Sequence, residues 1–406
     1  PAPPAARPTH RGCDTTNPHI DLDYLADTLE TFLTPPSPPS DTDTAVQWCG
    51  QELARLGIPF EVTRRGASRA VLRGTERRPA RAIAAHLDTL GAQVKGIKEN
   101  GRLAIVPIGY WSARFAEGAR CTIFTERGSY RGTVLPLMAS GHTYGDDVDE
   151  QPTGWRHVEV RVDARCSSAA EANRLGIDVG DIISIDPQPE FLENGYICSR
   201  HLDDKAGVAV MFAALKALIP VKEQLPVDAY FLFTIEEEVG IGAANILTDE
   251  VASLIAVDNG TTAPGQNSAE FGVTLAMADQ NGPFDYPLTR KLARLCREDD
   301  INYQKDVFRH YLSDVASAVE AGHDVLTALN CFGDDATHGW ERIHIHALRS
   351  LAELVTAYLL SPIAFWRDAE LVGTLEDFTS QPTEKAQQKL SSDVRMDEIE
   401  DETVEE

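Results

Sequence analysis

Three stretches of the chain decide the fold, because each places metal-binding residue types at the end of a strand-like run. They are residues 82–88 (AIAAHLD), 229–238 (AYFLFTIEEE) and 253–258 (SLIAVD). In an open α/β sheet, ligands bind in a crevice beyond the carboxyl ends of the strands. The three stretches therefore predict that His, Glu and Asp side chains, which are divalent-metal ligands in proteins, meet at one cleft.

Composition indicates the size of the protein and its class of partner. The chain has 406 residues and 43% hydrophobic content, which is enough for two packed domains. It carries 37 Lys and Arg against 63 Asp and Glu, a formal net charge of -26. Such a charge repels nucleic acid and anionic membranes, so neither is an expected partner. Part of the excess lies in residues 391–406, which hold eight acids and one Arg.

The seven cysteines contain no CxxC or CxxxC pair, which excludes a zinc ribbon or a thiol redox motif. The N-terminal segment has no apolar region typical of a signal peptide, and no run of about 18 apolar residues occurs. We therefore expect a cytoplasmic protein with reduced thiols.

The spacing of apolar residues divides the chain into regions. Helical patterns occupy residues 22–32 and 41–56, whereas residues 92–197 consist of short strand-like runs separated by Gly and Asn. Alternating helix and strand patterns return after Asp203. The chain therefore predicts one α/β domain interrupted by a β-barrel-like insertion. The expected parts are a disordered N-terminus (1–17), the α/β domain (18–91 and 198–365), the inserted domain (92–197) and an acidic, disordered tail (366–406).

Two acidic motifs have both a structural and a chemical interpretation. His86 and Asp88 form an H-x-D pair whose side chains point the same way in an extended chain, so the carboxylate could orient the imidazole. On its own, however, a His at a strand end is more often an ordinary polar residue than a metal ligand. Asp203 and Asp204 open a predicted helix, and N-capping accounts for Asp204. Asp203 lies at the strand-to-helix turn, where a carboxylate could bridge two cations about 3.5–4 Å apart.

The run Glu236, Glu237 and Glu238 follows a strongly apolar strand. Three carboxylates there repel one another unless cations or protonation compensate. A solvated loop is the ordinary explanation for an acidic run, but the next residues, VGIGA, form a tight Gly-containing passage. One carboxylate could therefore bind metal while its neighbour acts as general base on a water.

Local sequence leaves alternatives open for the last candidate ligands. Asp258 follows the apolar run LIAV, but an Asp before Asn259-Gly260 is also typical of a turn. His338 lies in the loop GDDATHGW, and His344 and His346 follow closely. Residue type alone allows any of the three histidines to be a ligand.

Four ordered motifs resemble family forty-two of the metallopeptidases, the glutamyl and tetrahedral (TET-type) aminopeptidases. The motifs are HLDT at 86–89, LDDKAG at 202–207, EEVG at 237–240, and the later Asp and His. The resemblance spans about residues 22–360. It implies an α/β fold: a three-layer catalytic domain with a mixed central sheet, and an inserted β-barrel or PDZ-like domain. It also implies an aminopeptidase that acts on short peptides or small amides.

The resemblance also implies a role for each matching residue. Two divalent metal ions per subunit are expected, with Zn as the first choice and Co or Mn as alternatives. The implied metal ligands are His86, Asp203, Glu238, Asp258 and His338, with Asp203 bridging the two ions. Glu237 would be the base that activates a bridging water, and Asp88 would orient His86. The family further implies a dimer-based homo-oligomer of up to twelve subunits.

The chain departs from the common family pattern in three places. A third acid, Glu236, precedes the Glu dyad. Lys205, which we expect to pair with the neighbouring acids, stands where many relatives carry Arg. The last His occurs in THGWE, which aligns His338 and Glu341 with the family and leaves His344 as an alternative ligand. This version, together with residues 308–322 (FRHYLSDVASAVEAG), resembles the bacterial branch associated with the osmoprotectant N-acetylglutaminylglutamine amide.

Two other functions fit the same residues. A dizinc deacylase acting on N-acylated amino acids or peptides could use the same ligands but would prefer a blocked N-terminus. A non-catalytic scaffold would be expected to lose ligands, and all five candidates are present.

Overall fold

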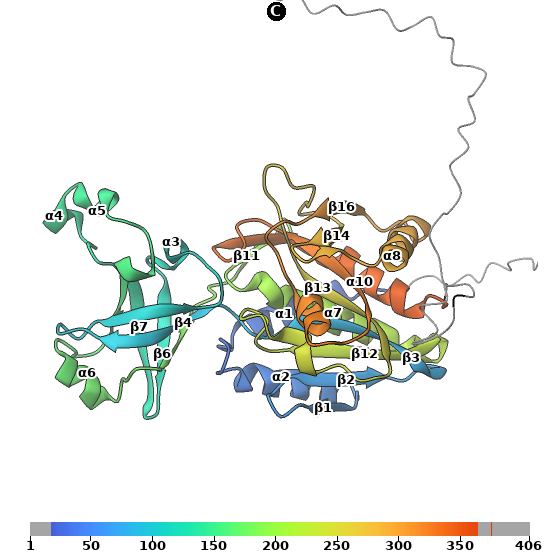
Figure 1. The fold of residues 1–406 in the computed structure, drawn as a ribbon, viewed down its shortest axis with the longest axis horizontal. Helices are drawn as coiled ribbons and strands as arrows, with labels where there is room; N and C mark the ends of the chain where they lie inside the picture. The colour runs from blue at the N-terminus through green and yellow to red at the C-terminus, as the bar shows by residue number, and fades with distance from the viewer. Residues whose placement is uncertain (1–17, 364–374, 376–406) are drawn as a thin grey trace, which may run out of the picture.

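The computed structural model describes residues 18–363 and residue 375. The ends predicted to be disordered, 1–17 and 366–406, lie outside these residues except for residue 375. A large α/β unit is joined to a smaller unit that extends from one side of it (Figure 1). Within the described part of the chain, no helix combines the length and the apolar character needed to cross a membrane.

A nine-stranded sheet forms the centre of the large unit. Its order is β1 (Phe60–Val62), β2 (Ser68–Leu72), β12 (Val227–Thr234), β3 (Glu76–His86), β13 (Val251–Thr261), β17 (Leu326–Asp334), β14 (Val273–Asp279) and β15 (Gly282–Pro283), with β16 (Tyr303–Val307) beside β14. The four central strands β12, β3, β13 and β17 are parallel, while β2 pairs antiparallel with β1 and β12. Strand β14 pairs antiparallel with β17 and β15 but parallel with β16. Every residue of β12 is buried, as expected for a parallel strand covered on both faces.

Helices flank this sheet, and α7 is the most deeply buried of them. The helices are α1 (Leu22–Leu33), α2 (Asp43–Arg55), α7 (Leu202–Leu218), α8 (Tyr286–Glu298), α9 (Asp314–Glu320) and α10 (Ile345–Leu360). Short 3-10 helices occupy Ile219–Gln224 (η2) and Gly242–Asn245 (η3). Helix α7 contacts α1, α10 and strands β3 and β13, so apolar residues surround it. The ring of Phe212 on α7 stacks on Phe32 at 5.4 Å and on Phe233 at 4.8 Å between centroids.

The smaller unit is a closed barrel with its own core. Its strands, in barrel order, are β4 (Gly91–Ile97), β5 (Leu103–Ile108), β8 (Val158–Val162), β7 (Gly128–Pro136), β6 (Arg120–Thr125) and β9 (Ile182–Ile185). Short helices connect them: α3 (Ala113–Ala116), α4 (Gly141–Tyr144), α5 (Asp147–Glu150), η1 (Trp155–His157) and α6 (Ala169–Leu175). Buried side chains such as Val94, Ile123 and Ile183 form a cluster separate from that of the large unit. The predicted fold class, a mixed α/β sheet with an inserted β-barrel, is therefore confirmed.

The chain returns to the large unit through a small antiparallel sheet. Strands β10 (Glu190–Phe191), β11 (Tyr196–Ser199) and β18 (Glu341–His344) form it in that order. Strand β11 is followed closely by α7, and β18 is followed directly by α10. Because β11 and β18 pair with each other, this sheet brings the starts of the two helices together.

The parallel arrangement brings the three deciding stretches to one edge of the sheet. His86 is the last residue of β3, and the Glu run follows the end of β12. The expectation that Asp258 directly follows its strand is wrong, because β13 continues to Thr261. This extension arises because Asp258 to Thr261 remain paired with β17, where Asp258 lies opposite Cys331.

The stacked aromatic core predicts a large stability loss on truncation. Replacing Phe212 by Ala should lower the free energy of unfolding by about 3–5 kcal/mol, because it removes a buried ring and leaves a cavity. Denaturant unfolding followed by circular dichroism measures this. The matched control is Phe191→Ala, since Phe191 is 37% exposed on β10 and should cost far less. Equal losses in both variants would contradict this account of the core.

Candidate metal centre

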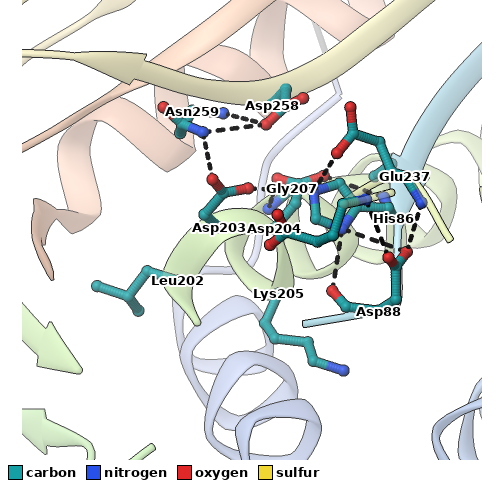
Figure 2. A network of polar contacts seen from close by, with 12 residues as sticks. His86, Asp88, Leu202, Asp203, Asp204, Lys205, Gly207, Glu237, Asp258 and Asn259 are labelled. Carbon is teal, nitrogen blue, oxygen red and sulfur yellow. Dashed lines mark hydrogen bonds and ion pairs between the residues drawn. The ribbon is translucent and has the colours of Figure 1, made fainter. Parts of the chain in front are cut away.

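The structure brings all seven predicted site residues to the carboxyl edge of the central strands. His86 and Asp88 lie at the end of β3, and Asp203 lies at the start of α7 (Figure 2). The remaining four come from other elements: Glu237 and Glu238 after β12, Asp258 in β13, and His338 in the loop between β17 and β18. Segments far apart in sequence therefore meet at one place.

Asp203 is the residue that the two halves of the site share. Its Oδ1 lies 3.1 Å from His86 Nε2, and its Oδ2 lies 3.2 Å from His338 Nε2. Two groups of potential metal-binding atoms result, each with its atoms within 4.8 Å of one another. One group is His86, Asp203 and Asp258, and the other is Asp203, Glu238 and His338.

Main-chain carbonyls orient both imidazoles with Nε2 toward Asp203. His86 Nδ1 donates to the carbonyl oxygen of Asp88 at 3.0 Å, and His338 Nδ1 donates to the carbonyl oxygen of Tyr110 at 2.7 Å. A proton on Nδ1 leaves the Nε2 lone pair free to bind a cation. In the structure it is the main-chain carbonyl of Asp88, at 3.0 Å, that accepts from His86 Nδ1, whereas the predicted partner, the Asp88 carboxylate, lies 3.6 Å away.

The Asp88 carboxylate holds the turn that carries the two glutamates. Its Oδ1 accepts from the amide of Glu237 at 3.0 Å, and its Oδ2 accepts from the amide of Glu238 at 3.1 Å. Glu236 has a left-handed backbone with φ of 67° and turns its side chain toward Arg65. One acid of the run therefore faces away, and the other two face the cleft.

Two residues that sequence reasoning left without a role support Asp203. Glu341 accepts from the amides of Leu202 at 2.7 Å and Asp203 at 3.2 Å through Oε2, and from the amide of His338 at 2.9 Å through Oε1. Asn259 donates from Nδ2 to Asp203 Oδ2 at 2.6 Å. Each of these two residues lies close after a predicted ligand in the sequence, Asn259 after Asp258 and Glu341 after His338, and this was the available signal. The Asp203 turn that they contact is distant in sequence.

The two residues that follow Asp203 on α7, Asp204 and Lys205, hold the surrounding main chain through hydrogen bonds. Asp204 accepts from the amides of His86 and Gly207, both at 3.1 Å (Figure 2). A Cβ at Gly207 would lie 2.2 Å from Asp204 Oδ1, so only glycine fits there. Lys205 is buried and donates to Ser37 Oγ at 2.7 Å and to the Leu87 carbonyl at 2.5 Å. These partners differ from the carboxylates that we expect for Lys205 from the sequence.

The alternative ligand His344 lies in a different environment. Its Nε2 donates to the carbonyl of Asn194 at 3.1 Å, and its Nδ1 accepts from the amide of His346 at 3.1 Å. Its ring packs against Tyr196 and Phe271. Both ring nitrogens are therefore engaged, whereas the Nε2 of His338 faces the shared aspartate.

A cleft of about 860 Å³ opens over these groups. The large unit contributes Asp203, Glu237, Glu238, Asp258 and His338 to its lining, and the barrel unit contributes Tyr110, Trp111, Ser112 and Phe115. His201 also links the two units, because its Nε2 donates to the carbonyl of Ile185 on β9 at 3.0 Å. The inserted domain thus forms one wall of the cleft, which the sequence did not indicate.

Burial and mutual repulsion strongly perturb the acids. Burial raises the pKa of Glu238, Asp258 and Glu341 to about 8, with the Asp203 carboxylate adding to each shift. Burial also raises the pKa of Glu237 well above its ordinary value. At Asp203 burial acts in the same direction, but the imidazoles of His338 and His86 hold its pKa well below the ordinary value.

The donor set fits divalent cations. Glu238 Oε1 is buried without a hydrogen-bond partner among the described residues. In addition, the surrounding groups carry excess negative charge. Imidazole nitrogens and carboxylate oxygens are the ligands that zinc accepts in open, catalytic sites. Two groups that share one aspartate offer the arrangement of a paired-cation centre.

Comparisons with known proteins agree with this geometry. Residues 66–354 match the model of a family described as M42 glutamyl aminopeptidase. A Bacillus subtilis (strain 168) protein named "Putative aminopeptidase YhfE" is 35% identical over 329 residues, covering 81% of this chain and 95% of that protein. The glutamyl aminopeptidase of Lactococcus lactis subsp. cremoris is 30% identical over 174 residues, covering 43% of this chain and 48% of that protein.

Solved structures show the same fold. The TET1 peptidase of Pyrococcus horikoshii superposes with a TM-score of 0.73 at 22% identity, covering 82% of this chain and 99% of that chain. That protein can assemble into a tetrahedron or a large octahedral shell.

The three amide contacts of Glu341 predict a loss of metal affinity on a neutral substitution. A carboxamide at this position has one acceptor oxygen, so Glu341→Gln should release either the Asp203 turn or the His338 loop. Supporting residues of this kind contribute about 10–100-fold to metal affinity. Chelator competition with zinc measures the change. Glu270→Gln is the control, because Glu270 pairs with the nearby Arg342 and does not contact the site. Unchanged zinc affinity in Glu341→Gln would contradict the supporting role.

The raised pKa values predict that the metal-free protein loses stability as pH rises. The folded state binds protons at Glu238, Asp258 and Glu341 up to about pH 8, far above the ordinary values of 4.5 and 3.8, so ionisation there favours unfolding. The pKa of His338, raised to about 10 by Glu238 and Asp203 against the effect of burial, acts in the same direction, because the stabilising charge of this imidazole disappears as pH rises. The Tm of chelator-treated protein should therefore fall between about pH 6 and 9.

Added zinc should raise the Tm more at the alkaline end of this range, where the acids are ionised and bind cations best. Differential scanning calorimetry with and without chelator measures both effects. A Tm of the metal-free protein that rises over this range would contradict the electrostatic account.

Proposed function

We propose, from the premise that this chain belongs to the M42 glutamyl aminopeptidase family, that it releases N-terminal residues from short peptides at a paired-cation centre. Family membership makes the chain a metal-dependent peptidase. The observation that carries the finer proposal is Asp203, whose two oxygens face His86 and His338 from two separate groups of potential ligands.

Each cation would have its own set of side chains. His86 and Asp258 would hold one ion and Glu238 and His338 the other, with Asp203 shared. Zinc is the ion that we propose, because imidazole and carboxylate together suit it, although cobalt and manganese accept the same donors. When bound, such ions polarise the scissile carbonyl and lower the pKa of a water from about 15.7 toward 7.

Glu237 is the residue that we propose as general base. Its Oε2 lies 3.7 Å from His86 Nε2, and the residue lines the cleft together with the proposed ligands Asp203, Glu238, Asp258 and His338. The Glu237 carboxylate would accept a proton from the attacking water as the new C–O bond forms. It would then deliver this proton to the leaving nitrogen as the C–N bond breaks. Asp88, which accepts from the amides of Glu237 and Glu238, keeps the base and the neighbouring ligand in register.

The charge balance of the cleft favours an amino-terminal substrate end. Five carboxylates, those of Asp203, Glu237, Glu238, Asp258 and Glu320, line it together with two histidines, His310 and His338. The four positive charges of two dications would not exceed the charge of these carboxylates, so no surplus positive charge would remain to bind a C-terminal carboxylate. A protonated α-amine is compatible with this environment, so removal of N-terminal residues fits better than carboxypeptidase activity.

We further propose that the chain forms a dimer-based homo-oligomer of up to twelve subunits. The fold shared with the Pyrococcus horikoshii TET1 peptidase, which itself assembles into a tetrahedron, supports this proposal. Sedimentation velocity distinguishes a dodecamer from a dimer or monomer, and a stable monomer would refute it.

Removing the charge of Glu237 should abolish turnover without removing the cations. We expect Glu237→Gln to lose about 10²–10⁴-fold in kcat, because general-base catalysis contributes that range. Glu236→Gln is the matched control, since Glu236 faces Arg65 and should leave kcat nearly unchanged. Peptide hydrolysis and metal content by mass spectrometry are measured on the same samples. Full turnover in Glu237→Gln would show that another group is the base.

The substrate class is tested with free and blocked amino termini. A panel of aminoacyl amides, short peptides, their N-acetylated forms and N-acetylglutaminylglutamine amide separates the alternatives. Cleavage confined to free N-termini supports the aminopeptidase. Cleavage of blocked substrates alone would refute it in favour of a deacylase, and hydrolysis of the osmoprotectant would link the enzyme to its turnover.

A further inference from the structure

The Pro-rich segment 35–39 (PPSPP) meets the buried Lys205 at Leu87, and no step of the proposed function uses either of them. Lys205 Nζ donates to Ser37 Oγ at 2.7 Å and to the Leu87 carbonyl oxygen at 2.5 Å. Ser37 Oγ itself donates to the same carbonyl at 2.8 Å. We call these three groups, the Lys205 ammonium, the Ser37 hydroxyl and the Leu87 carbonyl, the Leu87 clamp. It joins three segments that are distant in sequence.

The Leu87 clamp holds the main chain that orients a proposed ligand. The Asp88 carbonyl accepts from His86 Nδ1 at 3.0 Å, and the Leu87 carbonyl belongs to the peptide unit just before it. One residue further along, the amide of Thr89 donates to the Ser37 carbonyl at 3.0 Å. The carbonyl that directs the His86 ring is therefore fixed from both sides along the chain.

Lys205 leaves the same turn of α7 as the shared ligand Asp203 (Figure 2). Asp204, which lies between them, accepts from the His86 amide at 3.1 Å. Two successive residues of α7 therefore hold two successive residues, His86 and Leu87, one through an amide and the other through a carbonyl. This arrangement fixes the start of α7 against His86, whose Nε2 lies 3.1 Å from Asp203 Oδ1.

The burial of Lys205 is costly for stability. Its side chain is 1% exposed, and within residues 18–363 it forms no ion pair with a carboxylate. Burying a charged group without an opposite charge in contact costs free energy, and an apolar side chain would fill the same space at a lower cost. What the ammonium group supplies at this position is therefore its two hydrogen bonds to the clamp.

The second ligand group has supports of its own. The amide of Gly240 closes the Glu turn by donating to the Glu237 carbonyl at 2.7 Å. The ring of His338 takes its orientation from the Tyr110 carbonyl. Loss of the Leu87 clamp therefore acts mainly on the ligand group that contains His86.

We propose that Lys205 and Ser37 are positioning residues of the metal centre. Acting together through the Leu87 carbonyl, they hold the His86 imidazole toward its cation. This inference rests on the paired-cation centre of the proposed function. Loss of either donor weakens the ion of the His86 group, while the ion of the other group keeps its ligands in place.

The test removes the two donors one at a time. In Lys205→Met, we expect zinc in the His86 group to bind about 10–100-fold more weakly in chelator competition, the usual effect of losing a contact that supports a metal ligand. Ser37→Ala removes a neutral hydrogen bond and should weaken the same ion by about 2–10-fold. The zinc of the other group should keep its wild-type affinity. Anomalous diffraction from crystals at limiting zinc shows which of the two ions has been lost.

Lys216→Met is the matched control. Lys216 lies on the same helix, but its side chain is 37% exposed and pairs with Asp21, so its loss should leave both zinc affinities unchanged. Thermal unfolding of the metal-free proteins shows whether each variant folds. If Lys205→Met fails to fold, Ser37→Ala carries the test alone. The variant with both substitutions should not show the product of the two single effects, because both donors act on one carbonyl.

Three results would overturn the proposal. One is unchanged zinc affinity in the folded variants, and another is equal weakening of both ions, which would indicate a general loss of structure. The third is a double variant whose effect equals the product of the single effects, since the two residues would then act independently. Failure of the wild type to cleave peptides while it binds two ions would refute the aminopeptidase but leave this inference standing. A wild type that binds no zinc at His86 would refute both.

Discussion

The close approach of like charges around Asp203 is the constraint on which the rest of the site depends. Asp203, Asp258 and Glu341 are almost completely buried, and Asp204 and Asp88 are fully buried beside them. Ionised carboxylates in such an environment are unstable unless cations, protons or hydrogen-bond donors compensate. The fold supplies amide donors to Glu341, Asp88 and Asp204, whereas Asp203 relies on two imidazoles and Asn259. Two divalent cations would neutralise the negative charge that these contacts leave uncompensated.

The topology explains why this concentration of charge arises at one place. Strands β12, β3 and β13 are adjacent and parallel, so their carboxyl ends share an edge. Helix α7 begins at the same edge and adds Asp203, while the barrel covers it with Tyr110 and Trp111. His338 depends on both units, because the catalytic domain carries it and the Tyr110 carbonyl of the inserted domain orients its ring. A movement of the barrel would therefore change the metal centre as well as the shape of the cleft.

The amino-acid sequence was sufficient for the parts of the site that follow directly from buried strands. His86, Glu237 and Glu238 were placed correctly at strand ends, because continuous apolar runs and parallel topology determine those positions. The register of Asp258 was not predictable, because β13 extends through pairing with β17, a strand distant in sequence. His338 and His344 could not be separated, since only contacts with Tyr110 and Asn194 distinguish them. The sequence assigned no role to Glu341 or Asn259, because the residues that they support, Leu202 and Asp203, are distant in sequence.

The most direct test of the shared aspartate is anomalous X-ray diffraction from crystals of the zinc-loaded protein. The account predicts two anomalous peaks about 3.5–4 Å apart, one on each side of the Asp203 carboxylate. One peak should also contact His86 and Asp258, and the other Glu238 and His338. A single peak, or two peaks that do not both contact Asp203, would contradict the central claim.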